Sequence, residues 1–266
     1  MKLNPLTVTF WGIVTLCAAA CEDTLRNRVA RNEEDQALWL RNVLAAEVRI
    51  RERGQAAVPK VTQFLGQVAS VPGVEQSAIV DSLPGAPLAQ QIRIMPEGYP
   101  DWPVSFLHVV SPGYFEVMEL TLLRGRYFSQ KDVDSSLPVA IVNQFYAENI
   151  GNEPGQYILR EDTVGGRAKI DGSPVTLTII GVVQNSGLHY QTSPEVYIPY
   201  TQYASYGLLP YRGSNYRRLG EPTWYLLARV TKDRKAVAAR LQNVRGLEFP
   251  TLEEQLKAHM KVYGWD

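Results

Sequence analysis

The sequence predicts an α+β protein in which the two ends of the chain form one base and a β-rich segment is inserted between them. A strand–helix–strand pattern occupies 43–80, and a second strand–helix pattern occupies 224–249. Between them, short apolar runs alternate with Pro and Gly. A chain of 266 residues, 45% of them hydrophobic, is long enough to bury the core of one large domain or of two smaller ones.

The first pattern begins with a strand and continues with a helix. Apolar residues recur at every second position over 44–50, with Glu47 and Arg49 between them, which predicts a half-buried strand. Over 61–71 the apolar residues follow helical spacing, as in a helix that lays one stripe on a sheet. Pro72-Gly73 ends this helix, and 77–80 reads as a second strand.

The second pattern closes the chain. Apolar residues alternate over 224–230 as in a strand, and those over 237–244 follow the spacing of a short helix. A last strand is expected over 247–249, and the capping-box pair Thr251 and Glu254 starts a further helix. Two β-α-β halves of this size predict a split ferredoxin-like base.

The middle of the chain is expected to be rich in β structure. Short apolar runs predict strands over 91–95, 104–110, 139–142, 175–183 and 195–199, and helices over 113–118 and 143–149. The expected divisions are a leader over 1–21, a tether over 22–40, the first half of the base over 41–82, the inserted subdomain over 83–220, and the second half of the base over 221–260.

The N-terminus predicts export. Lys2 precedes an uncharged, largely apolar run over 6–20, which is short for a membrane span and fits the hydrophobic region of a signal peptide. Three alanines over 18–20 precede Cys21, as small residues precede the acylated cysteine of bacterial lipoproteins. Cys21 is therefore a candidate lipidation site. An uncleaved N-terminal anchor and plain secretion remain alternatives.

Charge and cysteine content exclude several kinds of site. Basic and acidic residues number 27 each, so the chain offers no clustered excess of positive charge of the kind that nucleic acid requires. Both cysteines, Cys17 and Cys21, lie in the leader, which leaves no disulfide framework and no thiolate metal site beyond it. We therefore expect no nucleic-acid partner.

The polar residues do not form a recognisable catalytic pattern. His108, His189 and His259 are scattered, and the chain lacks the HExxH and GxSxG motifs. Asp81-Ser82 and a distant histidine supply the residue types of a catalytic triad, but nearly any chain does, so they are not evidence for one. The acidic residues of the loops are expected to be solvated carboxylates: Glu97, Asp101, Asp132 and Asp134. We therefore expect no enzyme, no metal and no small-molecule cofactor.

One segment stands out as a candidate protein interface. Tyrosine recurs along 197–216 and two arginines follow it, and both residue types are favoured at interfaces. The candidate interface residues are Tyr203, Tyr206, Tyr211, Tyr216, Arg217 and Arg218. A loop packed by its own aromatic side chains, and a surface for glycans or lipids, are the alternatives.

Five motifs in order carry a resemblance to a known family. They are Val110-Ser111-Pro112-Gly113-Tyr114-Phe115, Leu122-Leu123-Arg124-Gly125-Arg126-Tyr127-Phe128, Pro138-Val139-Ala140-Ile141-Val142-Asn143, Ile179-Ile180-Gly181-Val182-Val183 and Pro194-Glu195-Val196-Tyr197-Ile198-Pro199-Tyr200. In this order, they resemble the periplasmic core domain of MacB/FtsX-like ABC transporter permeases over roughly 40–260. Independently of the resemblance, Gly125 suits a turn whose backbone a larger residue would crowd, and Gly181 suits a bulge or a close backbone approach.

The resemblance implies a non-enzymatic domain on the periplasmic side of the inner membrane. In that family the domain hangs from membrane helices and couples ATP-driven motion to an adaptor or substrate, so transporter ATPase, permease or adaptor subunits are the expected partners. The chain lacks the GxxxxGK[ST] phosphate loop, so it cannot hydrolyse ATP by that route. Partner chains that supply further membrane helices, a fragment, and a reused soluble module all remain open, as does a free-standing envelope lipoprotein that binds a ligand or partner.

Overall fold

The structure is a computed structural model that describes residues 42–49, 56–84, 90–96, 104–133, 136–149, 164–170, 175–186, 193–203, 223–231 and 233–245. These residues form ten strands and five helices. Helices and an extended, mostly antiparallel sheet are both present, which confirms the α+β class.

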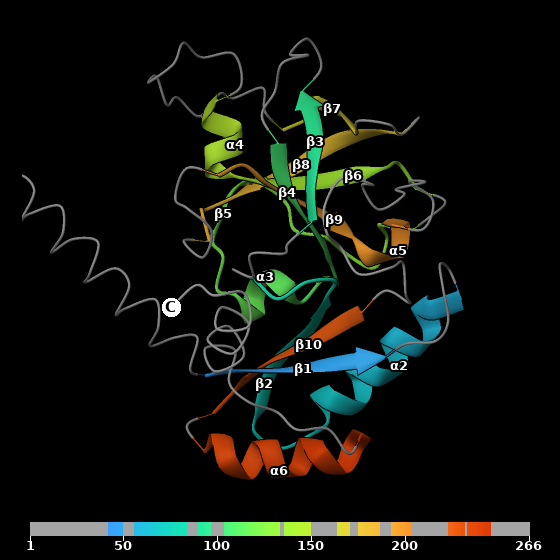
Figure 1. Ribbon diagram of the computed structural model, residues 1–266, viewed down its shortest axis with the longest axis vertical. Coiled ribbons are helices and arrows are strands. Elements are labelled where there is room, and N and C mark those ends of the chain that lie inside the picture. The colour runs from blue at the N-terminus through green and yellow to red at the C-terminus, as the bar shows by residue number, and fades with distance from the viewer. Residues whose placement is uncertain are drawn as a thin grey trace, which may run out of the picture. The chain divides into compact units, whose positions relative to one another are not determined.

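Both ends of the described chain meet in one three-stranded layer, which we call the base. Strand β10 (Thr223–Val230) lies between β1 (Val43–Arg49) and β2 (Val74–Val80) and is antiparallel to both (Figure 1). Helices α2 (Ala57–Ala69) and α6 (Arg234–Arg245) belong to the same core as one face of this layer. The expected strand over 247–249 and the helix starting at Thr251 lie outside the described residues, so the complete ferredoxin-like arrangement stays a prediction.

Strand β1 is more deeply buried than its alternating pattern predicts. Leu44, Ala46 and Val48 pack in the core shared with α2 and α6, and Glu47 is exposed, as expected. Val43 and Ala45, on the opposite face, are also fully buried. The prediction of a half-buried strand was therefore wrong at these positions, because the base is covered on both faces; helix α3 (Tyr114–Val117) contacts the neighbouring β2 and β10.

The inserted segment forms a closed ring of six strands. In order around the ring they are β4 (Val104–Val110), β3 (Gln90–Pro96), β7 (Arg167–Ile170), β8 (Thr176–Val183), β6 (Val139–Asn143) and β9 (Glu195–Pro199), and β9 pairs with β4 to close it. A further strand, β5 (Leu122–Gly125), pairs with β8. Helices α4 (Gln144–Asn149) and α5 (Tyr200–Tyr203) follow β6 and β9.

The five predicted strands and two predicted helices of the segment are all present. β5, β7 and α5 were not predicted, because each has only four residues and too few positions to show a period. We call the ring with β5, α4 and α5 the lobe, and α3 lies between it and the base. The division points at 82/83 and 220/221 stay predictions, since the sheet itself continues from base to lobe through the pair Val80 and Val110.

Two motif glycines face each other where β5 ends. Gly125 has φ of +77°, and a Cβ atom there would stand 2.2 Å from the carbonyl oxygen of Ile180. Its partner in the register is Gly181, where a Cβ atom would stand 2.5 Å from the carbonyl oxygen of Arg126. The register of β8 against β6 also shifts beside Gly181. The close backbone approach predicted for Gly181 is therefore confirmed, and so is the crowding predicted at Gly125, although Gly125 ends strand β5.

Candidate protein-contact site

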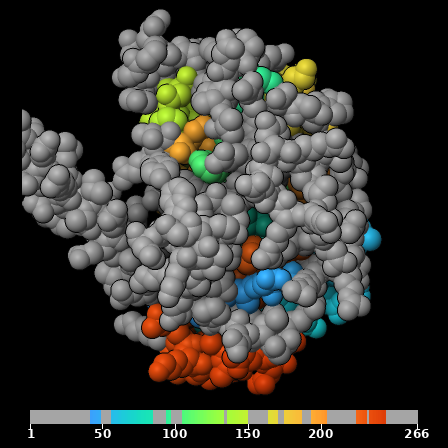
Figure 2. Space-filling model, viewed as in Figure 1, coloured from blue at the N-terminus to red at the C-terminus, as the bar shows by residue number. Residues whose placement is uncertain are grey.

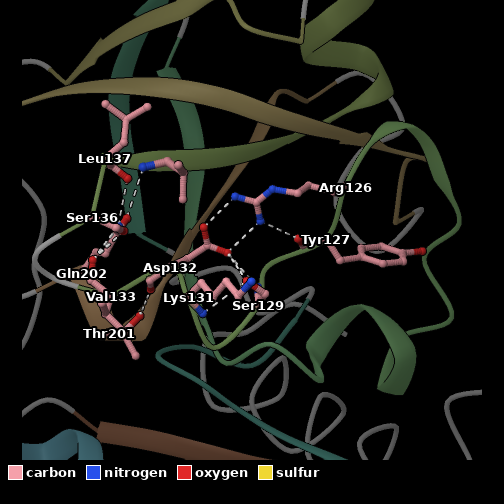
Figure 3. A network of polar contacts seen from close by, with 11 residues as sticks. Arg126, Tyr127, Ser129, Lys131, Asp132, Val133, Ser136, Leu137, Thr201 and Gln202 are labelled. Carbon is pink, nitrogen blue, oxygen red and sulfur yellow. Dashed lines mark hydrogen bonds and ion pairs between the residues drawn. The ribbon is translucent and has the colours of Figure 1, made fainter.

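The strongest candidate site is the loop that links β5 to β6, which an ion pair and several hydrogen bonds hold in place. We call residues 126–138 the contact loop; the structure describes all of it except 134 and 135. Arg126 and Asp132 form a bidentate ion pair, in which Nη2 lies 2.7 Å from Oδ1 and Nη1 lies 2.8 Å from Oδ2. The backbone amide of Ser129 donates to the same carboxylate at 2.7 Å. These contacts close the first half of the loop on itself (Figure 3).

Asp132 is not the solvated carboxylate that its position in a loop predicts. Its side chain is buried, with only 4% of the residue exposed. Burial by itself raises the pKa of this carboxyl, but the bonds from Arg126 and Ser129 outweigh it, so the pKa is lowered. Asp132 is therefore an ionised structural group, because its partners replace the water it lost.

Gln202 of α5 anchors the second half of the contact loop. Its buried amide donates through Nε2 to the carbonyl oxygens of Val133 and Leu137, each at 3.0 Å, and to the hydroxyl of Ser136 at 2.8 Å. Its Oε1 accepts from the amide of Val139 at 3.1 Å. Figure 3 shows Gln202 beside these groups. The side chain of Gln202 therefore satisfies three backbone polar groups of this segment and fixes the path of the loop.

The anchored loop presents apolar side chains to the outside. Leu137 is 63% exposed and Val133 is 37% exposed, and together with Leu123 of β5 they are the exposed large hydrophobic residues of the described chain. A loop whose backbone is already fixed loses less conformational entropy when a partner covers it. The arrangement therefore suits protein contact.

We expect Gln202→Ala to loosen this loop and to lower the free energy of unfolding by about 3 kcal/mol, since it leaves several buried polar groups without their partner. Urea denaturation of the full chain measures the change. Gln63→Ala, on the exposed face of α2, is the control, and we expect it to stay within about 0.5 kcal/mol of the parent. Equal effects of the two changes would show that Gln202 anchors nothing.

The residues that the sequence singled out lie next to this loop or outside the described residues. Tyr203 directly follows Gln202 and is half-buried against the core, and burial raises its pKa to about 12. The other candidate residues lie outside the described part of the chain: Cys21, Tyr206, Tyr211, Tyr216, Arg217 and Arg218. Their interface and lipidation roles stay predictions.

A second feature joins the base to the lobe through α3. From β10 of the base, the buried guanidinium of Arg229 donates to the carbonyl oxygen of Val117, through Nε at 2.9 Å and Nη2 at 2.6 Å. Its Nη1 pairs with Glu119 at 3.1 Å. Burial lowers the pKa of Arg229, while the charges of Glu119 and Glu75 oppose this change. Arg229 therefore fixes the last turn of α3 to the base.

The other side of α3 packs against the ring. The rings of Tyr114 and Phe115 lie 5.7 Å and 5.3 Å from that of Tyr197 on β9, centroid to centroid. Tyr197 in turn stacks on His108 of β4 at 5.2 Å. Helix α3 therefore makes contacts with both the base and the lobe.

A buried acid lies beneath this aromatic cluster, and sequence reasoning missed it. Glu195 accepts hydrogen bonds from the hydroxyls of Ser186 and Tyr197, each at 2.8 Å, and its own amide donates to Asn143 Oδ1 at 3.1 Å. Burial raises the pKa of Glu195. In the sequence, Glu195 was visible only as a single acidic residue at the start of an apolar strand. Tyr197 lies on the same strand, but Ser186 and Asn143 come from other parts of the chain, so the full set of partners was not visible there.

Asp81 sits where the chain passes from base to lobe. Its Oδ1 accepts from the amide of Val109 at 2.9 Å, and its own amide donates to the Val109 carbonyl at 3.1 Å. The hydroxyl of Ser82 lies 3.5 Å from the same carboxylate. These contacts hold the end of β2 against β4, and they are structural rather than those of a nucleophile and its base.

Asp81 predicts a pH dependence of stability. Burial raises its pKa to about 7, and the hydrogen bonds that it accepts only partly oppose the rise. The unfolded chain releases this proton near the usual value of 3.8, so the folded protein alone keeps it between that value and about pH 7. This contribution to stability is therefore fully present below pH 3.8 and is lost as the pH rises through about 7.

The measurement is the thermal unfolding midpoint as a function of pH for the parent and Asp81→Asn. The asparagine keeps an oxygen for the Val109 amide but cannot titrate. We expect the midpoint of the parent to fall more steeply with rising pH than that of Asp81→Asn. Parallel curves would mean that Asp81 titrates normally.

The described residues hold neither a metal cluster nor a membrane-spanning helix. No group of three or more His, Cys, Asp and Glu residues among them is arranged to hold a metal ion. None of the helices in the described ranges is long and apolar enough to cross a bilayer.

Comparisons with known structures give neighbours of low sequence identity. The periplasmic region of MacB from Actinobacillus actinomycetemcomitans is 14% identical, with a TM-score of 0.49 over 82% of this chain and 92% of that chain. The extracellular domain of the ABC-type transporter YknZ from Gram-positive bacteria is 17% identical, with a TM-score of 0.46 over 78% and 98%. A domain of a permease protein from Porphyromonas gingivalis is 13% identical, with a TM-score of 0.45 over 79% and 89%.

The comparison with curated proteins gave no match. The comparison with protein families is informative, because the model of the MacB-like periplasmic core domain matches residues 26–244, which is more than half of the chain. The five motifs lie within this range and build α3, the Gly125–Gly181 crossing, β6 and β9. The protein therefore belongs to the family of MacB-like periplasmic core domains of ABC transporter permeases.

Proposed function

We propose that the protein acts in an ABC transporter permease system on the extracytoplasmic side of the membrane, by contacting other subunits and passing motion between its base and its lobe. Membership of the family supports this placement. The N-terminal tether, with Cys21 as its lipidation site, belongs to the same proposal.

The observation that carries the proposal is the position of α3. Its carbonyl end is held by Arg229 of the base, while its aromatic side chains pack on Tyr197 of the lobe. A second link joins Thr62 of α2 to the hydroxyl of Tyr200 of α5 at 3.2 Å. The buried polar and aromatic contacts of α3 resist independent movement of the two parts. A displacement of the base would therefore be passed on to the lobe.

The contact loop supplies the surface on which a partner would act. The buried side chains of Asp132 and Gln202 fix the course of the loop, and the side chain of Leu137 is exposed to solvent. The tyrosines and arginines that follow α5 in the chain are further interface residues in our proposal. The expected partners are transporter ATPase, permease or adaptor subunits.

A photo-crosslinking amino acid at position 137 tests the contact. The full chain is expressed in cells that hold its native transporter, irradiated, and purified under denaturing conditions. We expect a covalent adduct with an ATPase, permease or adaptor subunit, identified by mass spectrometry. The control carries the same amino acid at Lys169, which is exposed on β7 of the lobe.

An adduct at 137 and none at 169 supports a specific contact. If neither position captures a transporter subunit, the permease proposal fails, and a free-standing envelope lipoprotein becomes the better description. Equal capture at both positions would show that the contact loop is not the site.

A further inference from the structure

One helix of the base carries charge of a single sign. Helix α6 contains four basic residues and no acidic one, although the whole chain has 27 of each kind. The basic residues of α6 are Arg234, Lys235, Arg240 and Arg245. Helix α2, which packs beside α6, contains one further basic residue, Lys60, and also no acid. Among the described residues, the two helices on this side of the base thus carry basic and no acidic side chains.

The basic side chains of α6 that the structure describes reach solvent. Val237 and Leu241 are buried against the strands, whereas Lys235 and Arg240 are exposed and Arg234 is half-buried. Arg240 also donates to the carbonyl oxygen of Pro72 at 2.9 Å, which holds its guanidinium at the turn between α2 and β2. In Figure 2, α6 (red) lies uncovered at the surface.

The described acids near α6 are fewer than its four basic residues. Asp233 precedes α6, and its Oδ1 accepts from the amide of Ala236 at 3.3 Å, in the first turn of the helix. Glu75 interacts with Arg229, on the side of the base that faces α3. In β1, Ala46 and Val48 face α2 and α6. Glu47 lies between them in the strand, so its side chain is on the opposite face of the base, away from α6.

We propose that the outer face of α6 binds anionic phospholipid headgroups. Between its basic residues this face exposes Ala239, Gln242 and Asn243, and none of the exposed large hydrophobic residues of the described chain lies on α2 or α6. Protein interfaces normally include apolar or aromatic anchors, whereas basic residues are attracted to an anionic membrane surface without them. Charge complementarity therefore favours a lipid surface over a protein partner.

The course of the chain supports the same occupant. The chain enters the base at Asn42, whose carbonyl oxygen accepts from the amide of Val230, and α6 begins four residues after Val230. Asn42, the first described residue of the base, is therefore close in the chain pairing to the start of α6. This inference depends on the proposed function for its location near a membrane.

Vesicle co-sedimentation of the full chain tests the proposal. The vesicles are phosphatidylcholine alone, or phosphatidylcholine mixed with phosphatidylglycerol, and the measured quantity is the gain in binding that phosphatidylglycerol produces. The test variant is Arg234→Gln with Lys235→Gln. The matched control is Arg167→Gln with Lys169→Gln, which removes the same charges from two exposed positions of β7.

At low salt we expect the test variant to lose on the order of tenfold in phosphatidylglycerol-dependent affinity, and added salt to weaken the parent. We expect the control to bind like the parent. Equal binding by the parent and the test variant would overturn the proposal, and so would an equal loss in the control, because net charge alone would then explain it.

The proposed function can be judged separately. An adduct from position 137 with no lipid dependence at α6 would overturn only the present inference. Lipid binding that depends on α6, without any transporter adduct, would overturn only the proposed function. If the test variant keeps its vesicle binding but loses co-purification with the permease, α6 contacts a protein and the lipid proposal is wrong.

Discussion

Replacing Gly125 by alanine is expected to lower the free energy of unfolding by about 4 kcal/mol. Two costs add at this position. A non-glycine residue at a φ of +77° is strained by about 1–2 kcal/mol. The new Cβ would also stand 2.2 Å from the Ile180 carbonyl oxygen, so β5 and β8 would have to separate at a further cost of about 2–3 kcal/mol.

Gly165→Ala is the matched control for this prediction. Gly165 has a similar φ of +93°, but no atom lies within 4 Å of its would-be Cβ. It therefore isolates the backbone strain, and we expect a loss of about 1 kcal/mol. Chemical denaturation of the two full-length variants provides the comparison. If both lose the same free energy, the close crossing of the strands contributes nothing.

The second large effect is expected from Arg229→Met. Methionine fills much of the space of the arginine stem but leaves the buried carbonyl oxygen of Val117 without a donor, at a cost of about 2 kcal/mol. The end of α3 is then no longer held by the base. We expect transport by the assembled system to fall at a temperature at which the variant is still folded, because the base and lobe are coupled less tightly.

Glu119→Gln is the control for Arg229. It removes only the ion pair with a carboxylate whose side chain is 57% exposed, while both bonds to Val117 remain. We expect a loss below about 1 kcal/mol and nearly unchanged transport. Transport is measured in cells that carry the native partners, and folding is measured by the thermal midpoint of each purified chain. Normal transport by a folded Arg229→Met variant would remove α3 as the coupling element.

The two predicted effects act on different parts of the proposed device. The glycine crossing sets the start of the contact loop, since Gly125 directly precedes Arg126. Arg229 controls how the base holds α3. A variant of Gly125 should therefore weaken partner contact and stability together, whereas a variant of Arg229 should leave the adduct from position 137 in place while transport falls.

Local patterns in the sequence were sufficient for most of the elements. The alternation over 224–230 and the helical spacing over 61–71 predicted β10 and α2, because burial on one side repeats with the period of the element itself. The motif glycines were also interpretable, since a glycine within an apolar strand usually marks a bulge or a close backbone approach. Family membership followed from the order of the motifs.

The tertiary structure alone decided the candidate site and the coupling. Gln202 and Val133 are 69 positions apart, and Arg229 and Val117 are 112 positions apart. No local period records such a pairing, so Asp132 appeared to be a solvated loop acid and Arg229 a polar position of a strand. The closing of the ring by β9 on β4 depends on the same kind of long-range contact. The sequence thus determined which residues form strands and helices, and the fold determined which polar groups meet, because buried polar groups must find partners wherever the chain brings them together.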